Sequence, residues 1–535
     1  MKINNIYIKS LILLFLIVSL VCPLFAMFVN LGEVDVARIF SSPYFVTIIL
    51  NTVTVTLTAT ILSVFLAFIS AWLVARSNIK HKRLLVTLFT IPMLIPSISH
   101  GTGLIVLFGN NGVITNLLNI NFSIYGFWGI VVGSLFYSFP VAFLMFYDSL
   151  QYEDGTVYLA ANVLGIPKYS QLLRITLPYL RKSMIAVFFS VFTLIFTDYG
   201  IPLMIGGKYT TLPLYMYNEV IGLLDFGKGA LIGCLLMIPA FIAFLVDVFN
   251  KENTIITFHS YPYIPSKNKR RDIIATVWST LLIVLLFLPI LVFFFLTFID
   301  NYPISMCFSL EHIARAMNLG LPRYLGHSLI ISLFTAILGT FVSYITAYFT
   351  ARTKGRLTKL LHLFSMISMA VPGIVLGLSY IIFFQRSPIY GTISILILVN
   401  SIHFFASPYL MAYNALNKLN PNYEGISKTL GISQYKLVLD VFVPQTLETI
   451  LEQFSYFFVN SMVTISAVSF LSVSSNQPLS LMIPNLESMM LIGSISFVSI
   501  LILMVNLIMK ALIHFFKKLA KEINSKKENM IYETE

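Results

Sequence analysis

Long uninterrupted runs of apolar residues dominate the chain and alternate with shorter segments rich in charge, glycine and proline. A run of about 20 apolar residues can cross a bilayer as a helix, and these runs lack the period-two alternation of barrel strands. The pattern predicts about twelve membrane-spanning helices in two sets of six. The first set covers 11–30, 44–75, 84–107, 124–148, 181–204 and 229–249; the second covers 273–298, 327–351, 358–384, 390–415, 448–471 and 489–514.

The two sets are copies of one unit. Residues 51–76 align without gaps to residues 327–352, an offset of 276, and Pro96 then falls on Pro372. Because each copy holds an even number of helices, both enter the membrane in the same direction, as parallel repeats. The sequence therefore predicts an all-α polytopic membrane protein.

This prediction divides the chain into four parts. A first repeat covers 1–249 and a second covers 273–516, joined by a polar, basic linker at 250–272 and followed by a charged tail at 517–535. Residues 2–26 could also be a signal peptide, but the second repeat opens with an equivalent helix that cannot be one.

Composition and charge agree with this architecture. Of the 535 residues, 58% are hydrophobic and 10% are charged, which excludes a water-soluble fold. On one side of the predicted membrane lie 28 of the 34 Lys and Arg residues, so that side is cytoplasmic and holds both termini. The net charge of +12 then needs no nucleic acid as partner. The three cysteines are too widely spaced to predict a disulfide framework or a metal site.

Two cytoplasmic segments, each between the fourth and fifth helix of its repeat, are longer than a helix connection requires. These are the first loop, 156–178, and the second loop, 422–444. Each reads as two short helices around a glycine suited to a left-handed turn, Gly165 or Gly431. Pro167 and Ser433 are suited to start the second short helix, and Pro178 and Pro444 are predicted to break it before the next span.

Such a helix-turn-helix suits docking into a groove of another protein, with the small Ala160 and Ala161 on one side. An amphipathic helix lying on the lipid surface is the alternative. In both loops the proline lies 13 positions after the glycine. Lipid contact demands no such fixed register, so the spacing favours a protein partner.

The loops resemble the EAA motif of binding-protein-dependent ABC importer permeases, in which Glu-Ala-Ala precedes a glycine and then Ile-x-Leu-Pro. The first loop matches it at Ala160, Ala161, Gly165, Ile175, Leu177 and Pro178, and the second at Gly431, Val441, Val443 and Pro444. The glutamate position holds Leu159 in the first loop and Gly425 in the second, where Glu424 lies one residue earlier. Ile426 and Ser427 replace the alanines.

The resemblance implies a type I importer permease of the bacterial cytoplasmic membrane. Each loop would be a coupling helix seated in one of two nucleotide-binding ATPase subunits, which would hold ATP and Mg²⁺, while an extracytoplasmic binding protein would deliver the solute. The chain itself would be no enzyme and would carry no cofactor. Its fused two-copy form is similar to permeases for ferric iron, thiamine and 2-aminoethylphosphonate, and the segments at 196–222 and 299–313 look most like the last of these.

Two other features could carry chemistry. Gly222–Lys228 is close to a phosphate-binding loop, but Gly229 stands where the Ser or Thr that binds Mg²⁺ belongs, so we interpret it as a chance match. Asp198 is a carboxylate near the end of an apolar helix, which makes it a candidate for the translocation path; an ordinary residue at a helix end is the alternative. An ion-coupled secondary transporter with six-plus-six parallel repeats is the alternative function, but such proteins normally need more buried ionisable groups.

Overall fold

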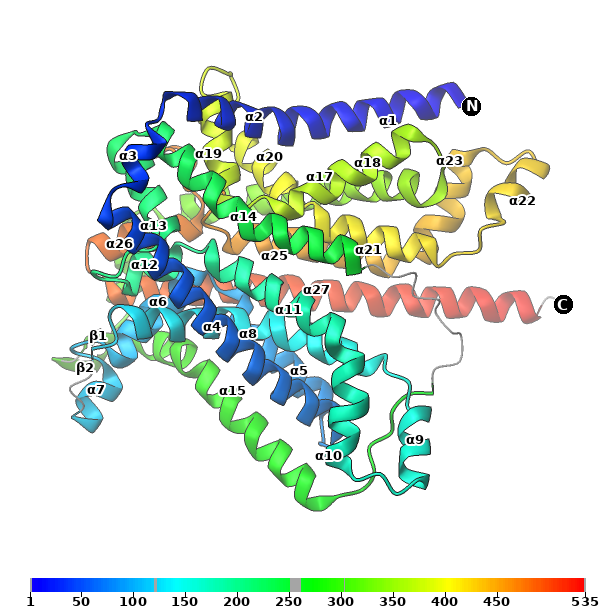
Figure 1. Ribbon diagram of the computed structural model, residues 1–535, viewed down its shortest axis with the longest axis horizontal. Coiled ribbons are helices and arrows are strands. Elements are labelled where there is room, and N and C mark those ends of the chain that lie inside the picture. The colour runs from blue at the N-terminus through cyan, green and yellow to red at the C-terminus, as the bar shows by residue number, and fades with distance from the viewer. Residues whose placement is uncertain (1, 120–122, 251–260, 303, 534–535) are drawn as a thin grey trace.

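A computed structural model describes residues 2–119, 123–250, 261–302 and 304–533. Within these ranges the regular secondary structure is helical except for one antiparallel hairpin of β1 (Ile299–Asn301) and β2 (Ser305–Phe308). Figure 1 shows the long helices side by side, with both termini at the same end of the molecule as the two predicted loops. Residues 251–260 of the predicted linker and 534–535 of the predicted tail lie outside the described ranges.

The helices of the two repeats follow in chain order. The first repeat contains α1 (Lys2–Leu16), η1 (Ile17–Val21), α2 (Cys22–Val29), η2 (Asn30–Glu33), α3 (Val36–Phe40), α4 (Pro43–Arg76), α5 (Lys82–Thr90), η3 (Ile91–Leu94), α6 (Ser97–Phe108), α7 (Val113–Leu118), α8 (Phe127–Gln151), α9 (Thr156–Val163), α10 (Lys168–Gln171), η4 (Leu172–Thr176), α11 (Leu177–Phe196), α12 (Gly200–Ile205), α13 (Leu212–Tyr217), η5 (Asn218–Gly222) and α14 (Phe226–Asn250). The second contains α15 (Lys269–Thr297), α16 (Glu311–Asn318), α17 (Leu321–Arg352), α18 (Arg356–Ile367), η6 (Ser368–Ala370), α19 (Gly373–Phe384), α20 (Ile393–His403), α21 (Ala406–Asn417), α22 (Tyr423–Thr429), α23 (Gln434–Leu437), η7 (Val438–Phe442), α24 (Val443–Gln445), α25 (Leu447–Val463), η8 (Leu479–Leu481), α26 (Met482–Ser488) and α27 (Ile492–Glu533).

The described residues contain nine helices long and apolar enough to cross a membrane, or eleven if two bent pairs each count as one span. The predicted eleventh span is represented by α25, which at 17 residues is close to the shortest helix that crosses a bilayer. The all-α polytopic fold is therefore confirmed. The predicted charged tail is the continuation of the last span, because α27 runs as one helix to Glu533.

The third span of each repeat was predicted as continuous but is broken at its proline. The two halves of this span in the second repeat, 356–370 and 373–384, meet at 109°. Residues before proline are pushed out of the helical region, and Ile95 and Val371 have extended backbones with ψ of 152° and 110°. Pro96 and Pro372 then cap new helices that start at the next residue.

The first helix of each repeat packs on the other repeat. Along the upper edge of Figure 1, α1 lies beside α18, and the Tyr380 hydroxyl of α19 donates to the Ser19 carbonyl at 2.6 Å. At the lower edge, α15 lies along the first repeat, where Trp278 Nε1 donates to Ser70 Oγ of α4 at 3.0 Å. The linker that leads into α15 is therefore brought to the end of the first repeat where the first loop lies.

A close helix contact fixes α15 on the first repeat, and it predicts the effect of one substitution. A Cβ at Gly103 of α6 would lie 2.6 Å from the Pro289 Cβ of α15, whereas a Cβ at Gly326 of α17 would meet nothing within 4 Å. We expect Gly103→Val to lower the free energy of unfolding by about 1–3 kcal/mol through overpacking. The matched change Gly326→Val should alter it by less than about 0.5 kcal/mol. Thermal denaturation of the two purified variants measures this, and equal melting temperatures would contradict it.

Candidate functional site: two anchored loops

The two loops share one build. In the first, α9 ends at Val163, Gly165 turns the chain with φ +69°, and α10 follows. In the second, α22 ends at Thr429, Gly431 has the same φ of +69°, and α23 follows. The left-handed turn predicted for each glycine is confirmed, and it is the conformation that glycine adopts without strain. Pro167 and Ser433 are the N-caps of the second short helices, as predicted.

Of the two prolines that end the motif, Pro178 does not break the helix as predicted, whereas the helix does end just after Pro444. In the first loop, residues 168–196 form one helical run through α10, η4 and α11, with Pro178 at the second position of α11. The preceding π-turn, η4, shifts the backbone hydrogen bonds to i→i+5 and so accommodates a residue without an N–H. In the second loop the helical run through η7 and α24 ends at Gln445, one residue after Pro444, and α25 begins at Leu447.

Each loop presents apolar side chains to its surroundings. Val163 and Leu164 are 88% and 76% exposed, and Leu430, the counterpart of Leu164, is 68% exposed. Large apolar side chains grouped at the tip of a solvent-facing loop are typical of a partner-binding surface. Of the two predicted alanines, Ala160 is exposed, whereas Ala161 is buried.

The buried small residue has a structural role. Ser427 occupies the position of Ala161 in the second loop and is also buried, with its hydroxyl donating to the Ile432 carbonyl at 2.9 Å. A small side chain is therefore kept beneath the turn in both copies. The outward positions differ, since Ala160 corresponds to the larger Ile426, which is 51% exposed.

Glu424 anchors the second loop to the membrane helix α17. Arg352, the last residue of α17, donates from Nε and NH2 to the two carboxylate oxygens of Glu424 at 2.6 and 2.7 Å. The same guanidinium donates to the carbonyls of Leu416, Leu419 and Asn420 at 2.8–3.3 Å. This bidentate pair is the strong geometry for arginine and carboxylate, so the Glu424 side chain is held by its own chain.

The first loop has the same anchor built from other residues. Arg76, the last residue of α4 and the counterpart of Arg352, is ion-paired with Glu153 just before α9. The Tyr158 hydroxyl donates to Glu153 and lies 3.0 Å from NH2 of Arg76. Tyr158 occupies the position that Glu424 has in the second loop. The carboxylate of the first anchor, Glu153, lies five residues before that position.

Of the residues in the two anchors, Glu424 was predicted from the sequence, whereas Arg76, Arg352 and Glu153 were not. The available signal was that both arginines end an apolar run and match each other at the repeat offset of 276. Nothing local to the sequence indicated their partners, which are 77 and 72 residues away.

Asp198 lies away from the loops, between α11 and α12. Its Oδ2 accepts from the Ile201 backbone N–H at 3.0 Å, and the Ser97 hydroxyl at the start of α6 also bonds to the carboxylate. The hydrogen bond to the start of α12 therefore holds this carboxylate in place, close to the start of α6. The lysine of the segment that resembles a phosphate-binding loop already has partners. Lys228 forms ion pairs with Glu219 at 3.3 Å and with Asp225 at 3.2 Å.

The anchors predict unequal losses when their carboxylates are removed. The side chains of Arg76 and Glu153 are only 6% and 3% exposed, so Glu153→Ala leaves a buried cation unpaired and should cost about 3–5 kcal/mol. Glu424 is 19% exposed and Arg352 keeps three carbonyl acceptors, so Glu424→Ala should cost about 1.5–3 kcal/mol. Thermal melting of the purified variants tests this ranking, and a larger loss for Glu424→Ala would refute it.

Known proteins with similar sequences are membrane permeases. The putative ferric transport system permease protein FbpB 1 of Haemophilus influenzae is 26% identical over 494 residues, which cover 86% of this chain and 77% of that protein. The ferric transport system permease protein FbpB of Actinobacillus pleuropneumoniae is also 26% identical, over 86% of this chain and 70% of that protein. The thiamine transport system permease protein ThiP of Haemophilus influenzae is 24% identical over 75% of this chain and 76% of its own length.

Both repeats match the same family. Residues 63–251 and, separately, residues 339–521 match the binding-protein-dependent transport system inner membrane component, and each match contains one of the two anchored loops. Together the matches cover more than half of the chain, which therefore belongs to this family of multi-pass ABC importer permeases.

Proposed function

We propose that this chain forms the whole membrane pore of an ABC importer and that its two loops receive the force of ATP hydrolysis from two nucleotide-binding subunits. The observation that carries the proposal is the pair of equivalent loops at one end of the molecule (Figure 1). Each has exposed apolar residues at its tip and is fixed to a membrane helix by an arginine. Force applied to such a loop passes directly into α4 or α17. This function fits the family better than ion-coupled transport does.

The orientation follows from the charge distribution. The loops and both chain ends lie at one end of the molecule, and most Lys and Arg residues fall in the segments assigned to that side. Positive charge is retained on the cytoplasmic side of membrane proteins. We therefore assign the loops and both termini to the cytoplasm, in a bacterial cytoplasmic membrane.

In this proposal the chain holds no nucleotide, and ATP and Mg²⁺ bind to the partner subunits. Lys228, which would have to contact phosphate, is held by Glu219 and Asp225. An extracytoplasmic binding protein delivers the solute to the opposite end. Asp198 is our candidate for the translocation path, because it lies beside Ser97, where the broken third span of the first repeat starts its second half.

Three solutes are candidates for the cargo. Two relatives are named as ferric permeases and one as a thiamine permease. The resemblance of 196–222 and 299–313 adds 2-aminoethylphosphonate, which we rank first. The experiment is a thermal-shift assay of the binding protein encoded beside this gene, with ferric iron, thiamine and 2-aminoethylphosphonate as probes. A shift with one probe identifies the cargo, and shifts with none of the three would overturn this set.

If the loops couple ATP hydrolysis to transport, backbone strain at their left-handed turns should reduce transport. A β-branched residue is disfavoured at φ +69°, so Gly431→Val should distort the second loop, and Gly165→Val the first. The left-handed conformation costs such a residue about 1–2 kcal/mol. We therefore expect each substitution to lower uptake per ATP hydrolysed by roughly ten-fold. The measurement is uptake of the identified probe into proteoliposomes containing the ATPase subunits and binding protein.

Gly425→Val provides the control. Gly425 lies in the same loop as Gly431 and has no left-handed φ, and a Cβ added to it would meet nothing within 4 Å. This change should therefore leave uptake per ATP unaltered. Normal coupling in both Gly165→Val and Gly431→Val would show that the loops do not transmit the work of ATP hydrolysis.

A further inference from the structure

The segment that joins the two repeats does more than connect them. Its described part, residues 261–272, is called the strap below. The strap lies against the first loop: the Gly155 N–H donates to the Tyr261 carbonyl at 2.7 Å, and Asp154 forms an antiparallel bridge with Pro262. A Cβ on Gly155 would lie 2.9 Å from the Tyr261 oxygen and 3.0 Å from the Pro262 oxygen, so the glycine permits this approach.

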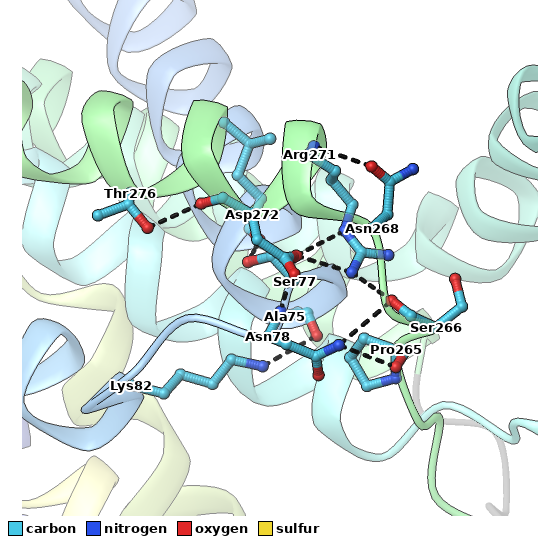
Figure 2. Close-up of polar contacts among 11 residues, drawn as sticks. Ala75, Ser77, Asn78, Lys82, Pro265, Ser266, Asn268, Arg271, Asp272 and Thr276 are labelled. Atoms are coloured by element: carbon cyan, nitrogen blue, oxygen red, sulfur yellow. Dashed lines mark hydrogen bonds and ion pairs between the residues drawn. The ribbon is translucent and has the colours of Figure 1, made fainter.

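The strap is also bonded to the end of α4, as Figure 2 shows. The Asn78 backbone N–H donates to Asp272 at 3.0 Å, and its side-chain amide donates to the carbonyls of Pro265 and Ser266 at 3.1 and 3.2 Å. Arg271 completes the cluster, since its guanidinium donates to the Ser266 carbonyl at 2.6 Å and to Asp272 at 2.7 Å. The strap is therefore fixed to the two elements that Arg76 and Glu153 join.

A comparison of the two anchors shows what the strap contributes. In the second loop the guanidinium of Arg352 lies 5.0 Å from the centre of the Phe442 ring, which belongs to that loop. The corresponding residue of the first loop is Thr176, which has no ring. The first loop instead offers its own Tyr158, whose ring centre lies 4.5 Å from the Arg76 guanidinium, and Tyr263 of the strap adds a second, closer ring with its centre at 3.8 Å. An aromatic face attracts a cation and shields its ion pair from water.

We propose that the strap is a positioning element of the first loop, and that its Tyr263 ring completes, together with Tyr158 of the loop, the aromatic cover of Arg76. The inference rests on the proposed coupling function. It makes the first docking site for an ATPase subunit depend on the linker as well as on the first repeat. The anchor described for the second docking site draws its residues from the second repeat.

The test compares two tyrosines of the strap. Tyr263→Ala should weaken binding of the ATPase subunit to the permease in nanodiscs by roughly two- to five-fold, the range of one cation–π contact. Tyr263→Phe keeps the ring and should bind normally. Tyr261→Ala removes a neighbouring ring that is 47% exposed, while the backbone carbonyl that contacts Gly155 remains, and should also bind normally. Binding by Tyr263→Ala equal to that of the unaltered chain would overturn the proposal.

A reversible cross-link separates positioning from general stability. Bridge partners in antiparallel strands have Cα atoms about 4.5–5.5 Å apart, within reach of a disulfide. Asp154→Cys with Pro262→Cys, placed in the Tyr263→Ala chain, should restore ATPase binding on oxidation and lose it again on reduction. A defect that persists in the oxidised form would show that the strap does not act by holding the loop.

The two proposals fail in different ways. If Gly165→Val uncouples transport while Tyr263→Ala and the cross-link change nothing, the loops couple ATP hydrolysis to transport and the strap only connects the two repeats. If Gly165→Val and Gly431→Val are both coupled normally, the coupling function itself is refuted, and the role of the strap falls with it.

Discussion

A guanidinium group at the end of a membrane helix has to be paired, and two such groups organise the end of this protein that carries the two loops. Arg76 and Arg352 end α4 and α17, and both are largely shielded from solvent. An unpaired cation in such a place costs several kcal/mol, so each requires a carboxylate brought from elsewhere. In both repeats that carboxylate comes from the segment before the fifth span, and the loop is thereby tied to the second span.

This constraint is met differently in the two repeats, and the difference makes the duplicated protein asymmetric. The second repeat uses Glu424, in the loop helix itself, with backbone carbonyls around the cation. The first uses Glu153, which precedes the loop helix, with Tyr158 in the place of Glu424 and Tyr263 as a cover. A fused chain allows this divergence, because each site is encoded separately and the linker is always next to the first one.

Two further features shape the membrane region. The first is the break of the third span of each repeat at Pro96 or Pro372, since the residue before a proline leaves the helical conformation. The second is the packing between the repeats. The exchanged first helices, α1 and α15, cover the opposite repeat and bury apolar surface between the copies. The placement of α15 on the first repeat also brings the strap to α4. The asymmetry of the first docking site is therefore a consequence of the helix exchange.

The sequence by itself determined the features that depend on neighbouring residues. The apolar runs defined the number and approximate bounds of the spans, the offset of 276 revealed the repeat, and Gly165 and Gly431 marked the left-handed turns. Hydropathy and turn preference act over one helix or less, which is why they can be read from a single sequence. Only the tertiary structure decided the 109° bend at Pro372, the helical path through Pro178, the exchange of first helices and the partners of the two arginines. An ion pair between residues more than 70 positions apart depends on how helices pack, and no local pattern records that packing.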